Sequence, residues 1–222
     1  MKNREAGFSL AELAIVLAVV AVLASMGVPR TQRWLVDQEA SATARSIANA
    51  LSYARGEAIR SGTNQIVFMN IAGAGDVLGN PLLDANGNAT PILILSDGVP
   101  GSPLQNCQID AGEPVKTIKT NAALSWGHGI SNGLKAPGDN TAMLTNGGST
   151  FVTPTGGAST WVMFRPDGTP LAMTAGCNAG AIGSGNGGIY FTNGTRDYAV
   201  VLRPMGGVKI HSYDQSANAW RN

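Results

Sequence analysis

The sequence is poor in charged residues, histidine, cysteine and aromatic residues. Only 13% of its 222 positions are charged, and 15 basic residues balance 14 acidic ones, so the formal net charge is +1. Such a chain is not a polyelectrolyte, and its bulk charge does not resemble that of a nucleic-acid binder. Its hydrophobic content of 44% excludes a disordered tail.

The few histidines and cysteines limit the chemistry as well. Cys107 and Cys177 form no CxxC pair, and with the two histidines they show no spacing typical of zinc ligands. Glycine-rich strings at 129–133 and 183–188 match short enzyme motifs only formally, because no helix is predicted after either. Since no convergent catalytic set is present, we expect no enzymatic activity, no cofactor and no metal.

One long apolar run dominates the N-terminus. Residues 13–28 hold no charged side chain, and the run extends back to Phe8 with only Glu12 and two serines as interruptions. A helix over 8–28 would be roughly 32 Å long, enough to cross the hydrocarbon layer of a membrane. Basic residues precede the run, which predicts a cytoplasmic N-terminus and an exported remainder.

Glu12 is the unusual residue of this run. A carboxylate in lipid costs on the order of 3 kcal/mol, so it is usually paired and usually functional. A new cation would appear as an α-amine at Phe8 if the chain were cut after Gly7, and a neighbouring copy shifted along the helix axis could bring its amine to Glu12. The pattern therefore suggests an assembly contact between subunits. A cleavable secretory signal ending at 24–26 is the alternative, and it does not explain Glu12.

The string REAGFSLAEL at residues 4–13 resembles the class III signal of type IV pilins and type II secretion pseudopilins. It has a short charged leader, a glycine at the cut, a phenylalanine next, and a glutamate shortly after. The resemblance implies that a prepilin peptidase cleaves between Gly7 and Phe8 and methylates the Phe8 amine. It also implies that Glu12 neutralises this amine on an adjacent subunit.

The helical pattern continues beyond the apolar run. Gly27 and Pro29 predict a kink, because proline lacks an N–H and clashes with the preceding turn. From residue 40, apolar residues recur at helical spacing and predict an amphipathic continuation that ends at residue 61, before Gly62. They are Ala40, Ala44, Ile47, Ala48, Leu51, Ala54, Ala58 and Ile59.

After residue 62 the sequence changes to short β-prone runs between turn residues. We predict strands at 65–70, 91–96, 115–120, 150–153, 160–164, 188–191, 198–202 and 208–213. Residues 165–168 and 204–207 have the composition of hairpin turns. The expected fold class is α+β: a long N-terminal α-helix, half transmembrane and half amphipathic, packed on a C-terminal antiparallel β-rich domain, which resembles the pilin plan.

The expected organisation has four parts. Residues 1–7 form the leader, 8–28 the transmembrane and assembly helix, 29–61 its amphipathic continuation, and 62–222 a periplasmic β-rich domain. In an oxidising compartment we expect Cys107 and Cys177 to form a disulfide. Closing a loop of about 71 residues would stabilise the fold by roughly 4 kcal/mol.

The C-terminal half resembles one branch of the pilin-like proteins. Residues 161–168, 188–191, 198–202 and 207–210 are similar to the end of the GspH/FimT family. That resemblance implies a two-sheet domain and a minor, low-copy subunit that helps to initiate a filament and lies at or near its tip. The implied location is the bacterial inner membrane, single-pass, before incorporation into the filament. The implied partners are other minor and major pilins or pseudopilins, the prepilin peptidase and the inner-membrane assembly platform.

Three functions remain open. The first is a minor type IV pilin with a role in pilus biogenesis and in motility or adhesion, and the second is a minor pseudopilin of a type II secretion system. The third is a minor pilin that binds DNA for uptake. Its cations would be Arg196, Arg203, Lys209 and Arg221, although residues 194–197 hold one arginine beside an acid.

Overall fold

The computed structural model describes residues 10–71, 73–98, 105–110, 112–120, 124–139 and 147–222, with the backbone alone at 26–30. Within these ranges the chain forms one helix and ten strands. The chain divides into two compact units, Met1–Glu39 and Ala40–Asn222. The helix contributes residues to both units.

The helix α1 is Leu10–Ser61. The strands are β1 Asn64–Met69, β2 Ile92–Asp97, β3 Val115–Ile118, β4 Ser125–Trp126, β5 Trp161–Phe164, β6 Pro170–Leu171, β7 Gly187–Thr192, β8 Asp197–Leu202, β9 Val208–Asp214 and β10 Ala219–Arg221.

α1 ends at a glycine cap. Gly62 has a φ of 70°, and its N–H donates to the carbonyl of Ala58 at 3.0 Å. A glycine in this left-handed conformation is the usual way to close a helix, because it has no Cβ to clash. The predicted end of the helix is therefore confirmed. The helix continues through Gly27 and Pro29, and the kink expected there stays a prediction.

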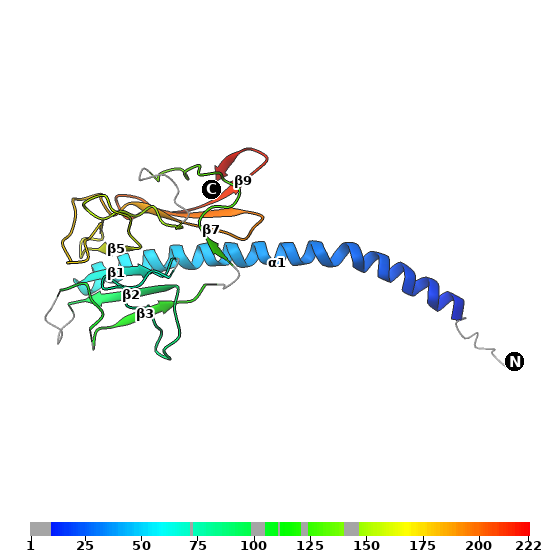
Figure 1. Ribbon diagram of the computed structural model, residues 1–222, viewed down its shortest axis with the longest axis horizontal. Helices are drawn as coiled ribbons and strands as arrows, with labels where there is room; N and C mark the ends of the chain where they lie inside the picture. The colour runs from blue at the N-terminus through cyan, green and yellow to red at the C-terminus, as the bar shows by residue number, and fades with distance from the viewer. Residues whose placement is uncertain (1–9, 72, 99–104, 111, 121–123, 140–146) are drawn as a thin grey trace. The chain divides into compact units, whose positions relative to one another are not determined.

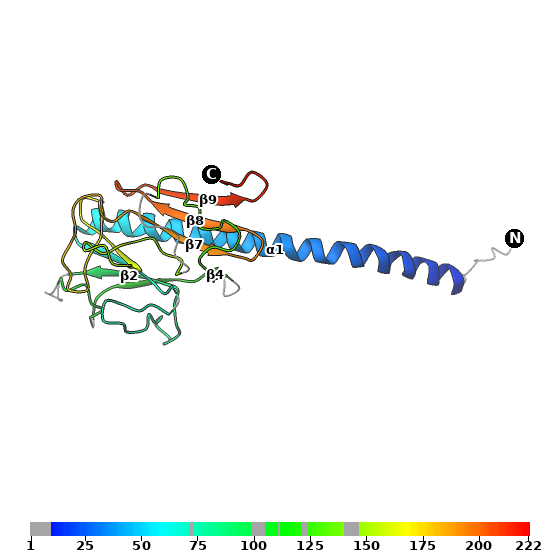
Figure 2. The same ribbon diagram turned by 45° about the horizontal axis from the view of Figure 1, so that its top comes forward.

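The second unit has two antiparallel sheets. The first has the order β3-β2-β1-β5-β6 and the second β10-β9-β8-β7-β4. Figures 1 and 2 show strands of the first sheet on one side of the α1 segment in this unit and strands of the second sheet on the other. The predicted α+β class with two antiparallel sheets is confirmed and is consistent with a pilin-like plan.

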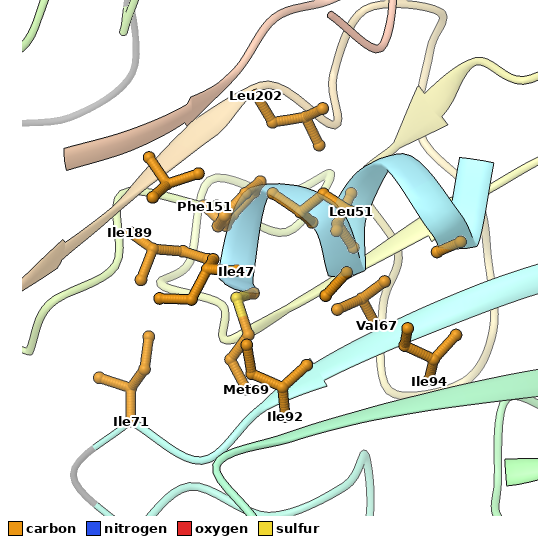
Figure 3. Close-up of a cluster of buried hydrophobic side chains, with 14 of the residues drawn as sticks. Ile47, Leu51, Val67, Met69, Ile71, Ile92, Ile94, Phe151, Ile189 and Leu202 are labelled. Carbon is orange, nitrogen blue, oxygen red and sulfur yellow. The ribbon is translucent and has the colours of Figure 1, made fainter. Parts of the chain in front are cut away.

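The main core lies where this helical segment meets both sheets. Ile47 and Leu51 of α1 pack with Val67 of β1 and with Ile189 and Leu202 of the second sheet (Figure 3). Successive side chains of β1 point to opposite faces of its sheet, as in any strand. Val67 and Met69 join this core, while Ile66 and Phe68 join a second cluster on the opposite face of the sheet.

The predicted apolar stripe of the helix is buried as expected, with one exception. Ala40, Ala44, Ile47, Leu51, Ala54 and Ala58 are buried, and Ala48 is half-buried. Ile59 is 54% exposed instead. It belongs to the last turn, where its Cδ1 lies against the turn at Gly168 rather than between the sheets.

The strand predictions are wrong for segments that pair with a neighbouring strand over only one to three residues. The strand expected at 150–153 does not form; this segment makes only isolated bridges, Ser149 with Ile189 and Val152 with Ala158. The short strands β4, β6 and β10 were not predicted. Strands of two or three residues carry no detectable alternation, so their existence depends on the neighbouring strand that pairs with them.

One five-residue turn recurs four times in the loops, at 76–80, 84–88, 153–157 and 174–178. In each, the side-chain oxygen of the first residue, Asp or Thr, accepts the N–H of the fifth, at 2.9 to 3.1 Å. The fourth residue has a positive φ and is glycine in the first three turns. In the last turn it is Cys177, with a φ of 64°.

Candidate functional site

The N-terminal part of α1 presents an apolar surface. Its large apolar side chains between Leu10 and Leu23 are all 54% to 86% exposed. They are Leu10, Leu13, Ile15, Val16, Leu17, Val19, Val20, Val22 and Leu23. Burying each of these would contribute on the order of 1–3 kcal/mol, so this surface is suited to contact other apolar groups.

Glu12 is exposed in the first turn of this helix. It is therefore accessible on the same apolar segment, where the sequence predicts its role in assembly. Gly7 and Phe8, the predicted cleavage and methylation positions, lie outside the described residues. Their role stays a prediction from the sequence.

Membrane crossing is a separate question from this apolar surface. Among the residues that the structure describes, no helical stretch combines the length and the apolar character needed to cross a membrane. The span expected over residues 8–28 is thus not shown and stays a prediction.

The predicted disulfide is present. Cys107 and Cys177 are joined across 70 positions of sequence, and Cys107 belongs to the second hydrophobic cluster. Asp97 of β2 lies beside the bridge, and its Oδ2 accepts the N–H of Cys107 at 3.3 Å. Ligand atoms of these three residues lie within 4.8 Å of one another. The paired sulfurs are not thiolates, the form of cysteine that binds metals.

Asp97 is fully buried. Its Oδ1 has no hydrogen-bond partner among the described residues. Burial raises the pKa of this carboxyl to about 6, and the neighbouring carboxylates of Glu113 and Asp110 act in the same direction. Nothing in the local sequence marks this residue, because its environment comes from the loop at 105–113 and from Cys177, which tertiary folding brings against it.

Of the four basic residues proposed for DNA contact, two lie together and two lie apart from them. Arg196, in the turn between β7 and β8, and Arg221 of β10 line the same pocket. Arg203 lies near Gly138: a Cβ atom placed on Gly138 would lie 3.2 Å from Nε of Arg203. Lys209 of β9 is paired with Val201 of β8. The structure therefore brings two of the four together and leaves the other two elsewhere on the sheet.

Two further buried polar groups, Asp197 and His211, belong to strands of the second sheet. Asp197 is almost fully buried and accepts the N–H groups of Gly129, Ile130 and Ser131 at 2.8 to 2.9 Å. This concave run of donors is a typical anion site, here filled by the chain's own carboxylate. The 129–133 string that formally matched an enzyme motif is thus a loop folded around Asp197.

His211 of β9 is the second such group. Its side chain is 1% exposed, and neither ring nitrogen has a hydrogen-bond partner among the described residues. Burial lowers the pKa of this imidazole, and the positive charges of Lys209 and Arg203 lower it further. Its burial could not be predicted from sequence, because it depends on the loop that covers this residue.

Comparison with known proteins bears on the N-terminal segment. Residues 2–28 match the family described as the prokaryotic N-terminal methylation motif. The chain carries a prokaryotic N-terminal methylation motif. This match supports a type IV pilin-like protein of a pilus or pseudopilus, with N-terminal processing of the prepilin kind. The motif includes Gly7, Phe8 and Glu12, the residues selected from the sequence.

The motif covers only the first part of the chain. No curated protein and no solved structure matches the chain significantly. The GspH/FimT resemblance of the C-terminal half is accordingly not confirmed, and it stays a prediction.

Proposed function

We propose that this chain is a minor type IV pilin, a low-copy subunit that helps to initiate pilus assembly and lies at or near the filament tip. The observation that carries the proposal is the methylation motif over residues 2–28, in which the helical part presents an exposed apolar surface. In this proposal the peptidase cuts after Gly7, Phe8 becomes the methylated N-terminus, and the helix holds the chain in the inner membrane until assembly.

The proposed assembly step is a packing reaction. Nine large apolar side chains between Leu10 and Leu23 are at least half exposed, and in the filament they would exchange contacts with lipid for van der Waals packing against the helices of other pilins. Glu12 is the acidic group of this surface. Its carboxylate would be neutralised by the Phe8 amine of an adjacent subunit, which sets the offset between two helices.

Export of the second unit is supported by its disulfide. The Cys107–Cys177 bridge is a bond that persists in oxidising compartments such as the periplasm. The proposed topology therefore has a cytoplasmic leader, one membrane crossing and a periplasmic domain. Partners in this proposal are major and other minor pilins, the prepilin peptidase and the inner-membrane assembly platform.

Processing is tested by mass spectrometry of the native protein. The expected product begins at N-methylated Phe8, and Gly7→Val should accumulate the uncut precursor because a branched side chain replaces glycine at the cut. A mature chain that begins at any other residue would overturn the proposal.

Assembly is tested by Glu12→Ala in the processed protein. Cleavage should stay normal while the amount of subunit in purified pili falls strongly. Glu39→Ala is the matched control, because Glu39 is an exposed acid on the same helix outside the methylation motif. Equal incorporation of Glu12→Ala and the wild type would remove the assembly role of Glu12.

A minor pseudopilin of a type II secretion system is the alternative, and the motif supports either system. We favour the pilus because the second unit carries long polar loops that suit display at a surface. Deleting the gene and scoring pili, motility and secretion separates the two, since a pseudopilin should affect secretion alone.

A further inference from the structure

A pocket of about 500 Å³ lies at one end of the second sheet. One wall is the β7–β8 turn with Thr195 and Arg196, and the other is the β9–β10 hairpin with Asp214, Gln215 and Arg221. The volume falls in the range of small-molecule sites. This pocket belongs to the second unit and is independent of the N-terminal motif.

Both walls are fixed by local hydrogen bonds. Asn193 Oδ1 accepts the N–H groups of Thr195 and Arg196 at 2.9 and 2.7 Å, which sets the β7–β8 turn. Asp214 Oδ1 accepts the N–H of Ser216 at 2.9 Å and sets the hairpin. A ligand would thus meet a preorganised site and would not need to order the loops.

The charges of the lining favour an anion. Arg221 Nη2 lies 2.7 Å from Asp214 Oδ2, so this pair is internally balanced. Arg196 is exposed, and its guanidinium makes no hydrogen bond or ion pair within the part of the chain that the structure describes. Two arginines and one aspartate give a formal charge of +1 for the lining, with Arg196 as the available donor.

The carboxylate of Asp214 does not cancel this donor. Hydrogen bonds from the Ser216 hydroxyl and from the N–H groups of Ala217 and Ser216 lower its pKa and occupy its Oδ1. Its Oδ2 faces Arg221. The guanidinium of Arg196 therefore meets no free carboxylate oxygen of Asp214, and its planar N–H groups match a carboxylate or phosphate from outside.

The rest of the lining decides between a compact anion and a nucleic-acid strand. Tyr213 is the aromatic residue of the lining, and it is 3% exposed and packed against Trp220, so it offers no face on which bases could stack. Arg203 and Lys209 lie outside the pocket, so the lining does not continue into a track for successive phosphates. Ser212 and Gln215 add polar groups that suit ligand hydroxyls.

We propose that this pocket binds an acidic sugar, with Arg196 holding its carboxylate or phosphate group and the polar side chains of β9 and the hairpin contacting its hydroxyls. The site would give the exposed end of the second sheet an affinity for acidic saccharides.

The test uses the full chain in a neutral detergent and calorimetric titration with glucuronate, glucose 6-phosphate and glucose. At least one acidic sugar should bind, and it should bind about tenfold or more tightly than glucose, because the charge-assisted hydrogen bonds are lost with the neutral sugar. The two acidic probes distinguish a carboxylate from a phosphate. Raised salt should weaken the binding.

Arg196→Gln should reduce the affinity about tenfold or more, whereas Arg203→Gln, the matched control at the opposite end of β8, should leave it unchanged. Both positions are exposed, and retention of the fold is checked by circular dichroism. The proposal is overturned if glucose binds as tightly as the acidic sugars, if none of them binds, or if both variants lose binding equally. Tighter binding of a single-stranded oligonucleotide through all four C-terminal cations would overturn it in favour of DNA. Pilus assembly of Arg196→Gln should be normal, which separates this site from the proposed function.

Discussion

Arg55 of α1 donates from Nε to the backbone carbonyl of Gly168 at 3.1 Å. Its Nη1 donates to the carbonyl of Gly206 at 3.4 Å. These two glycines belong to hairpin turns of different sheets, β5–β6 and β8–β9, and both have a positive φ. One side chain on the helix thus ties together the two turns that the sequence predicts, and with them the ends of both sheets.

Arg55→Met should destabilise the second unit by about 1–3 kcal/mol, because it keeps the aliphatic stem but removes both hydrogen bonds to carbonyls that are shielded from water. Urea unfolding followed by circular dichroism measures the change. Arg45→Met is the matched control, since Arg45 is exposed on the same helix and should change the stability little. Equal stability of the two variants would show that the bridge contributes nothing.

Cys177 occupies the turn position that glycine holds in three sister turns, with a φ of 64°. Cys177→Ser should cost roughly 4 kcal/mol, because it opens the large loop that the disulfide closes. Cys177→Gly should lose the same bridge but recover about 1 kcal/mol, since glycine adopts this conformation without steric cost. Urea unfolding without reductant compares them, with Cys107→Ser as the control that breaks the same bond from its other end. A less stable glycine variant would contradict the turn argument.

Asp97 should make the fold more stable as the solution is acidified from pH 7 to pH 4. Its pKa is raised to about 6 in the folded chain by burial, above the usual value near 3.9, so the folded state binds the proton more tightly. Asp97→Asn should gain about 2–3 kcal/mol at pH 7 and lose this pH dependence.

Asp84→Asn is the contrasting control for Asp97. Hydrogen bonds from the backbone of its own turn lower the pKa of Asp84, so its contribution is present at neutral pH and is lost as the pH falls. Unfolding free energies are measured from pH 4 to pH 7. Relative to the wild type, Asp97→Asn should be more stable at pH 7 and should approach the wild type by pH 4. Asp84→Asn should be less stable by a nearly constant amount over this range, because the contribution of Asp84 is lost only below the usual carboxyl pKa near 3.9. An unchanged pH profile in Asp97→Asn would contradict the assignment.

His211 should have the opposite effect to Asp97 on the pH dependence of stability, and it should do so at slightly higher pH. Its pKa is lowered by burial and by Lys209 and Arg203, so the unfolded state binds the proton more readily and stability falls as the pH drops below about 6.5. His211→Gln should flatten this decline, whereas His128→Gln, which leaves His211 in place, should not. Thermal unfolding between pH 5 and pH 8 measures both. A decline that persists in His211→Gln would assign it to another group.

Local chemistry explains which elements could be predicted. Helical spacing identified Ala44, Ile47 and Leu51 as a buried stripe, because residues at three- and four-residue spacing lie on one face of a helix and are buried together against the core. The hairpin turns at 165–168 and 204–207 were predicted from glycine and proline, whose backbone preferences do not depend on distant contacts. Ile59 was misplaced because the end of a stripe depends on how far the sheets extend along the helix.

The sequence by itself determined the N-terminal motif, the length of α1, most long strands and the Cys107–Cys177 pairing. Each of these depends on a pattern within a few residues or, for the disulfide, on there being only two cysteines. Only the tertiary structure decided the sheet order, the burial of Asp97, Asp197 and His211, and the separation of Arg196 and Arg221 from the other two cations. These properties arise where segments distant in sequence meet, and burial and hydrogen bonding there are set by the packing partner, which no local pattern specifies.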